Sequence, residues 1–279
     1  MGSLIMADSP WHATIIALFV WWFSTGIILW RVRVADNGDR YQHRLSVVMG
    51  LPLLCAGIFA FQAALPASSA IGTYLAFFAA VAIWGWIELA FLSGIITGPN
   101  RRPCPPNASQ STRFWRAVGT IAWHEALLLA TLVVMGLASQ QAANPFAFLT
   151  FALLFGARIL AKLNLFFGVP RINIQFLPRP LAHLASHFRV SRITAFFPFS
   201  VSLLTVASAF LLERAINATT PGTAVGFALL TCLALLAVLE HWFMVLPLPD
   251  EKLWRWMMPA RKIATPRIQD RLQEDPHGL

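Results

Sequence analysis

The stretch that decides the fold is residues 72–96, which read GTYLAFFAAVAIWGWIELAFLSGII. A helix needs about 20 mostly apolar residues to cross a bilayer core, and this stretch reaches that length with a single charged residue, Glu88. The whole chain has the same character, because 57% of its 279 residues are hydrophobic and only 12% are charged. Soluble domains carry about 25% charged residues, so the sequence predicts a membrane protein.

Six further segments have a similar length and apolar character. With the first, the predicted spans are 11–30, 45–65, 72–96, 119–138, 145–168, 194–212 and 224–247. These lengths suit helices and not the alternating strands of about ten residues that build membrane barrels. We therefore predict an all-α, polytopic bundle of seven transmembrane helices. It forms one membrane domain over residues 1–250, followed by a basic cytoplasmic tail over 251–279.

Arginine and lysine are distributed unevenly between the two sides of this predicted bundle. Of the 21 basic residues, 18 follow the first, third, fifth and seventh spans, in stretches 31–44, 101–116, 171–192 and 252–271. Positively charged loops remain on the cytoplasmic side, so we expect the N-terminus outside and the C-terminus in the cytoplasm. The net charge of +9 then indicates topology and contact with membrane lipid, and nucleic acid is not an expected partner.

Four of the predicted spans carry ionisable residues at similar depths. These residues are Glu88, His124, Glu125, Arg158, Lys162, Glu240 and His241. At 1.5 Å per helical residue, the charged members lie roughly 9 to 15 Å from the cytoplasmic ends of their helices. A charge in hydrocarbon costs at least about 2.5 kcal/mol, so such residues face the bundle and pair with one another. We expect a buried polar layer in the cytoplasmic half of the membrane.

Three interpretations of this layer remain open. The first is a network of ion pairs that fixes helix packing, in which Arg158 and Lys162 share a helix face and meet the glutamates. Three carboxylates, Glu88, Glu125 and Glu240, then face two cations. One carboxylate must be protonated, paired with a charged histidine, or bound to a metal. The second interpretation is a metal or pigment site, and the third is a pathway for protons or substrate.

A metal or pigment site would draw on glutamate and histidine side chains. The loop after the fifth span supplies two more histidines, which share one face if Pro180 begins an α-helix there. The candidate ligands for a di-metal (iron) centre or a magnesium tetrapyrrole are Glu88, His124, Glu125, His183, His187, Glu240 and His241. Against such a site, the segment with His183 and His187 lacks a Glu-x-x-His pair, which is the pattern of carboxylate di-iron bundles.

Several long motifs resemble those of one known family. They are IWGWIELAFLSGIITGPN (83–100), WHE (123–125), AKLNLFFGVPRIN (161–173), FLPRPLAHLASHF (176–188), LEHW (239–242) and VLPLPD (245–250). The chain is similar to PuhE, a family of photosynthetic-complex assembly proteins in bacteria that use bacteriochlorophyll. The resemblance extends from residue 11 to about residue 256, and the quoted motifs contain all the candidate residues named above except Arg158.

The resemblance implies an integral factor of the bacterial inner (cytoplasmic or intracytoplasmic) membrane. Such a factor assembles the bacteriochlorophyll photosystem, with its reaction centre and light-harvesting complexes, or modulates the supply of bacteriochlorophyll. Photosystem subunits or bacteriochlorophyll-synthesis enzymes are the implied partners, and bacteriochlorophyll is the implied pigment. The alternatives are a membrane-bound, metal-dependent oxidoreductase acting on a tetrapyrrole or isoprenoid, and a pigment-binding carrier. The family brings no catalytic residues. Our hypothesis is a cytoplasm-facing pocket whose acidic wall is Glu88, Glu125 and Glu240.

Overall fold

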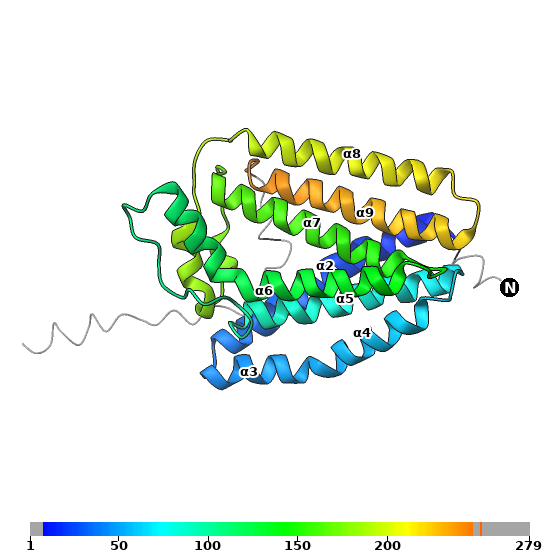
Figure 1. Ribbon diagram of the computed structural model, residues 1–279, viewed down its shortest axis with the longest axis horizontal. Coiled ribbons are helices and arrows are strands. Elements are labelled where there is room, and N and C mark those ends of the chain that lie inside the picture. The colour runs from blue at the N-terminus through cyan, green and yellow to red at the C-terminus, as the bar shows by residue number, and fades with distance from the viewer. Residues whose placement is uncertain (1–7, 248–251, 253–279) are drawn as a thin grey trace, which may run out of the picture.

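The computed structural model describes residues 8–247 and 252, and it is built from helices that lie side by side along the long axis of the molecule (Figure 1). The described residues form α2 (Pro10–Asp36), α3 (Arg40–Met49), α4 (Leu51–Ala64), α5 (Ala70–Leu92), α6 (Gln110–Ser139), α7 (Phe146–Phe167), α8 (Phe196–Ile216) and α9 (Pro221–Phe243). Two short 3-10 helices, η1 (Ile174–Phe176) and η2 (Arg179–His187), follow α7. Seven stretches are long and apolar enough to cross a membrane, which confirms the predicted polytopic bundle.

The second span is a helix broken near its middle. It runs from Tyr41 to Ala64 and divides into α3 and α4 at Gly50, which ends one helix and begins the other. Pro52, the second residue of α4, has no backbone N–H to donate, so it interrupts the regular hydrogen bonding of a helix. The indole of Trp86 on α5 donates to the carbonyl of Val47 beside the break, at 3.1 Å.

Helices α5 and α9 form the centre of the bundle. Their buried faces are rich in small residues, such as Ala76 and Ala80 on α5 and Ala234 on α9. Small side chains let helix backbones approach closely where no water drives association. The outer helices instead expose large apolar side chains, for example Phe199 and Phe210 on α8, as expected of surfaces that face lipid. The central pair therefore provides the scaffold on which α2, α6 and α7 pack.

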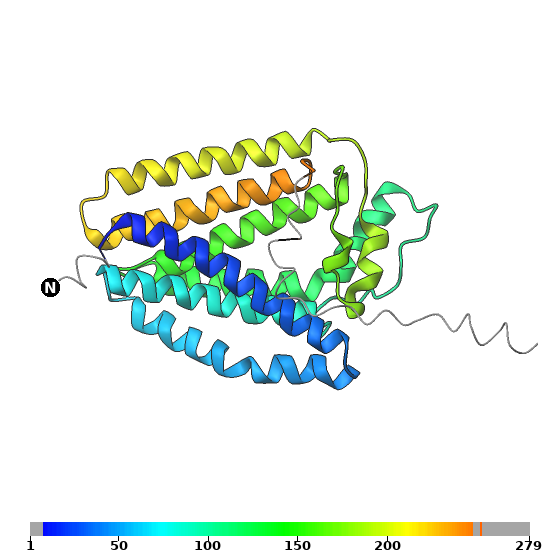
Figure 2. The same ribbon diagram turned by 180° about the vertical axis from the view of Figure 1, so that it is seen from behind.

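One end of the bundle carries the loop after α5 together with η1 and η2, which pack beside the beginning of α6 (Figure 2). The first described residues of α2 lie at the opposite end. Most of the basic residues lie at the end with the 3-10 helices: 31–44 covers the end of α2 and the start of α3, 101–116 covers the loop after α5 and the first turns of α6, and 171–192 follows α7. The predicted tail over 251–279 lies outside the described residues, apart from Lys252, and its arrangement remains a prediction.

Helix α5 ends at Leu92, before the predicted limit of the span, because the chain turns at Gly94. This glycine has a φ of 72°, a left-handed value that other residues adopt only with strain. The amide of Ile95 donates to the carbonyl of Ala90 at 3.0 Å and closes the end of the helix. A Cβ at Gly94 would lie 2.5 Å from the Cβ of Pro180. Glycine therefore lets η2 pack directly against the end of α5.

The segment predicted to be an α-helix from Pro180 is instead the 3-10 helix η2. A 3-10 helix has about three residues per turn, so positions three apart share a face. Accordingly Leu181, Leu184 and His187 form the buried side of η2. His183, which is four residues from His187, lies on a different face. The prediction that the two histidines share one face is therefore wrong.

Helix α6 begins well before the predicted start of the fourth span. Ser109 stabilises the earlier start because its hydroxyl accepts a hydrogen bond from the amide of Thr112 at 3.2 Å. Arg113 and Arg116, which were expected in the preceding loop, consequently lie in the first turns of α6. The hydropathy pattern predicted that the helix begins at the first apolar residues, whereas α6 begins earlier, in a segment with polar side chains.

Candidate functional site

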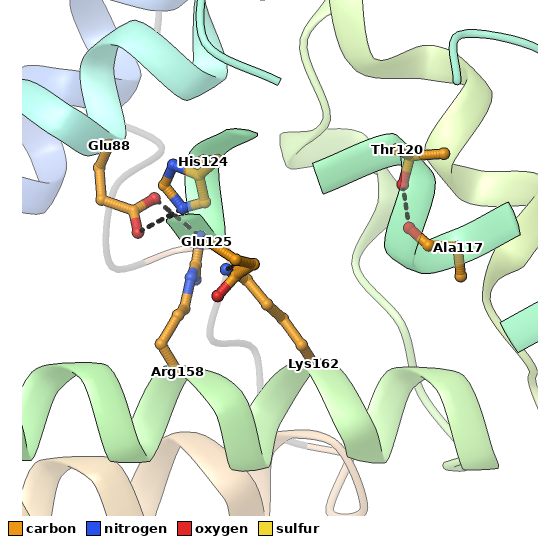
Figure 3. Close-up of polar contacts among 7 residues, drawn as sticks. All are labelled: Glu88, Ala117, Thr120, His124, Glu125, Arg158 and Lys162. Carbon is orange, nitrogen blue, oxygen red and sulfur yellow. Dashed lines mark hydrogen bonds and ion pairs between the residues drawn. The ribbon is translucent and has the colours of Figure 1, made fainter. Parts of the chain in front are cut away.

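Charged side chains from three helices meet in one cluster (Figure 3). Arg158 of α7 pairs with Glu88 of α5, with its Nη2 3.0 Å from Oε2. The Nε2 of His124 on α6 lies 3.6 Å from the other oxygen of Glu88. The Glu88 side chain is only 9% exposed. Because a buried charge needs nearby compensation, its ionised form depends on the guanidinium of Arg158.

A second ion pair lies one turn farther along α7. Lys162 donates a hydrogen bond to Oε1 of Glu125 on α6. Its ammonium group also lies over the ring of Phe91, 5.7 Å from the ring centroid, and the imidazole of His124 stacks on the same ring at a centroid distance of 4.2 Å. Arg158 and Lys162, which are four residues apart, thus form ion pairs with carboxylates from two different helices. The two pairs join α5, α6 and α7.

The backbone of the loop after α5 positions His124. The amide of His124 donates to the carbonyl of Thr97, and the amide of Asn100 donates to the carbonyl of Gly119, both at 3.0 Å. A Cβ at Gly98 would lie 2.1 Å from that same carbonyl oxygen of Gly119. The contact therefore requires glycine at position 98, and it holds the turn of α6 that carries His124 against the end of α5.

The third carboxylate of the layer, Glu240 on α9, stands apart from the two ion pairs. Its Oε1 accepts a hydrogen bond from the indole Nε1 of Trp21 on α2, at 2.7 Å. In the described part of the chain, the ion pairs within 4.0 Å leave Glu240 without a basic partner. The surplus carboxylate that the charge count predicts is therefore Glu240.

A cavity of about 570 Å³ adjoins the cluster. Its walls come from α2, α5, α6, α7 and α9, and the 3-10 helices and the loop before them close one side. Glu88, Arg158, Lys162 and Glu240 line it, whereas His124, Glu125 and His241 do not. The Arg158 side chain is 40% exposed although it lies within a predicted membrane span, since it borders this cavity. Apolar side chains make up most of the remaining wall.

The candidate metal or pigment ligands do not gather at one point. Among the described residues, no group of three or more histidine, cysteine, aspartate or glutamate side chains is placed to hold a metal ion. His241 is buried, and its Nδ1 lies 2.7 Å from the Ala237 carbonyl of its own helix. It points away from its neighbour Glu240, because consecutive residues are about 100° apart on an α-helix.

His183 and His187 occupy different surroundings on η2. His187 lines the cavity and is 2% exposed, whereas His183 is half-buried and is not among the lining residues. The Nδ1 of His187 lies 3.3 Å from the carbonyl of His183. Burial lowers the pKa of both imidazoles below the ordinary value of 6.5, and nearby arginines act in the same direction. Both rings are consequently neutral at neutral pH.

Several polar residues that line the cavity were not singled out from the sequence as site candidates, among them Trp21, Arg171 and Asn173. The backbone amide of Arg171 donates to the carbonyl of Met244 at 3.0 Å, which joins the loop after α7 to the end of α9. A signal for Trp21 did exist, since tryptophans in membrane helices concentrate at the two interfaces and Trp21 lies in the middle of its span. The sequence gives no comparable reason to single out the loop residues Arg171 and Asn173.

These observations define a class: a multi-pass membrane protein in which buried ion pairs border an apolar cavity whose carboxylate Glu240 forms no ion pair with any described residue. The cavity offers hydrogen-bond donors at Arg158 and an acceptor at Glu240 to a largely apolar molecule.

Comparison with known proteins assigns the chain to a family. Residues 6–265 match the model of DUF3623, a family described as proteins of unknown function, and the chain belongs to that family. The chain is 55% identical over 253 residues to an uncharacterized 30.4 kDa protein in the puhA 5′ region of Rhodobacter capsulatus, and the match covers 91% of this chain and 92% of the relative. No solved structure matches the chain.

Proposed function

We propose that this protein is an integral inner-membrane factor for assembly of the bacteriochlorophyll photosystem, acting on the complexes themselves or on the supply of bacteriochlorophyll. The relative that is 55% identical supports this role, because it is encoded near puhA in a photosynthetic bacterium. The motifs that resemble those of the PuhE family, such as residues 83–100 and 176–188, support the same role. Its partners are photosystem subunits or bacteriochlorophyll-synthesis enzymes.

The observation that carries this proposal is the cavity beside the ion pairs. Its volume of about 570 Å³ falls in the range of roughly 300 to 1,000 Å³ that small-molecule sites occupy. A factor that only joined protein subunits would have no use for an internal cavity faced by Arg158 and Glu240. The cavity favours a pigment-binding carrier as the way in which the factor acts. The scattered candidate ligands give no comparable support to a di-iron oxidoreductase.

Deletion and complementation test the function in a phototrophic bacterium that carries this gene. We expect deletion to lower the near-infrared absorbance of the reaction-centre and light-harvesting complexes, and the wild-type gene to restore it. A Glu88→Gln variant should restore it poorly while accumulating in the membrane, because Glu88 borders the cavity and holds Arg158. Immunoblots of the membranes give the amount of each variant.

Glu213→Gln is the matched control, since Glu213 lies on α8 away from the cavity and bonds to Asn217 at 2.6 Å. This variant should restore the complexes fully. Normal complexes in the deletion strain would refute the assembly role. A Glu88→Gln protein that fails to accumulate would show instead that the Glu88–Arg158 pair serves helix packing.

A further inference from the structure

Glu240 is the one carboxylate of the layer that an incoming ligand can reach without breaking an ion pair. Its side chain is exposed and lines the cavity. Trp21 holds one carboxylate oxygen at 2.7 Å, which fixes the orientation of the group. The second oxygen has no hydrogen-bond partner that the described residues provide. A positioned and accessible carboxylate in an apolar wall is suited to bind a cation or a Lewis-acidic metal.

The walls of the cavity favour a flat, conjugated ligand. Aromatic side chains from five helices line it, among them Trp21, Trp84, Phe91, Phe114, Phe166 and Phe243. Aromatic rings stack face to face with an offset, or edge to face, on other π-systems, so these walls suit a planar ring system better than a flexible chain. The exposed guanidinium of Arg158 supplies donors for carbonyl or ester oxygens at the edge of such a ring.

We propose that the cavity binds a magnesium tetrapyrrole and that Glu240 supplies the axial oxygen ligand to the magnesium. Magnesium is a hard cation that prefers oxygen ligands. The four ring nitrogens occupy the plane, which leaves an axial position for the protein. Trp21 is a positioning residue, because its N–H orients the ligating carboxylate in the way that outer-shell groups orient metal ligands. The choice of a tetrapyrrole rests on the proposed function, whereas the choice of Glu240 rests on the cavity.

The charge count agrees with this assignment. The side chains of the layer contribute three carboxylates and two cations, and Glu240 is the carboxylate without a cation. A free acid bearing an ionised carboxylate would add a further negative charge near Glu240. A neutral tetrapyrrole ester avoids that repulsion, and its metal interacts favourably with the carboxylate. The site should therefore prefer a magnesium-bearing, esterified macrocycle to a metal-free one.

A titration with two matched probes tests this proposal on the purified full-length protein in detergent micelles. The probes are magnesium protoporphyrin IX dimethyl ester and the metal-free dimethyl ester, which differ only in the metal. We expect the magnesium probe to bind saturably, to shift its absorbance bands, and to bind more tightly than the metal-free probe. Glu240→Gln should abolish this preference. Trp21→Phe keeps the ring but loses the donor, and should weaken binding about tenfold.

Two glycine substitutions separate binding in the cavity from partition into the micelle. Gly85 lines the cavity, and a Cβ there would meet only Ile28 Cδ1, at 3.7 Å. The Gly85→Leu variant should fold and should block binding by filling the cavity. Gly156 on α7 is outside the cavity, and a Cβ added there would have no heavy atom within 4 Å. The Gly156→Leu variant should bind the magnesium probe normally.

Equal affinity for the two probes, or a Glu240→Gln variant that retains the preference, would overturn the proposal. Loss of binding in His187→Gln with retention in Glu240→Gln would assign the metal to His187 and would also overturn it. Absence of binding together with photosystem loss in the deletion strain would refute this inference alone. Specific binding together with a normal deletion strain would uphold this inference and refute the assembly role.

Discussion

Glu88 and Glu240 both lie in apolar helices, but they contact different side chains and therefore have different roles. Glu88 is paired with Arg158 and adjoins His124, so it contributes to the packing of three helices as well as to the cavity wall. Glu240 is held by the neutral indole of Trp21. Removing one partner of a buried ion pair leaves an uncompensated charge, whereas neutralising Glu240 leaves none. Loss of Arg158 should therefore destabilise the bundle, because it leaves the buried Glu88 charge uncompensated, whereas Glu240→Gln should not.

The first prediction concerns Arg158→Met. This change leaves the Glu88 carboxylate buried without its cation and should lower the free energy of unfolding by about 3–5 kcal/mol. Arg214→Met, at the exposed end of α8, loses only a cation–π contact with Phe227 at 5.6 Å and should change it by less than about 1 kcal/mol. Unfolding of the purified proteins in mixed micelles with increasing SDS measures both. Glu88→Gln combined with Arg158→Met should recover part of the loss, and strictly additive effects would argue against a direct pair.

At the scale of elements, the end of the bundle with η2 depends on glycine. Gly94 adopts a positive φ and contacts Pro180, and Gly98 allows the loop to approach α6. Two close contacts at glycines thus set where η2 and His124 lie relative to α5. The pattern of apolar residues does not reveal such contacts, because they depend on the distance between elements and not on periodicity.

The second prediction concerns Gly94→Ala. The added Cβ is strained at a φ of 72°, which costs about 1–2 kcal/mol, and it would collide with Pro180. We expect faster amide hydrogen exchange in η2 and weaker binding in the cavity. Gly156→Ala is the control, since no heavy atom lies within 4 Å of its Cβ position and alanine favours a helix over glycine by about 1 kcal/mol. Unchanged exchange in η2 of Gly94→Ala would contradict the proposed contact.

At the scale of the whole molecule, hydropathy was sufficient to predict the seven spans, because each helix must bury its backbone polar groups within an apolar segment. The charge count likewise predicted that one glutamate would lack a cation. The sequence did not reveal which one, since the pairing of Arg158 depends on how α5, α7 and α9 are rotated. The prediction from the sequence was also wrong for η2, which is a 3-10 helix and not the expected α-helix. His183 and His187 consequently lie on different faces.

The third prediction concerns the orientation of the bundle. In a variant without the native cysteines, Gln141→Cys lies in the loop between α6 and α7, and Arg192→Cys lies at the end with the basic loops. A membrane-impermeant maleimide should label Gln141→Cys in intact spheroplasts and Arg192→Cys only after permeabilisation, because basic loops stay in the cytoplasm. The opposite pattern of labelling would invert the predicted topology.

The central claim is that the cavity beside the charged layer is used in photosystem assembly. Glu240→Gln tests it most directly, because glutamine can still accept the hydrogen bond from Trp21 and no ion pair is broken. The measurement is the near-infrared absorbance of the photosystem complexes per amount of this protein in the membrane. The account predicts a normal amount of Glu240→Gln protein with a reduced photosystem. A normal amount of both would contradict it.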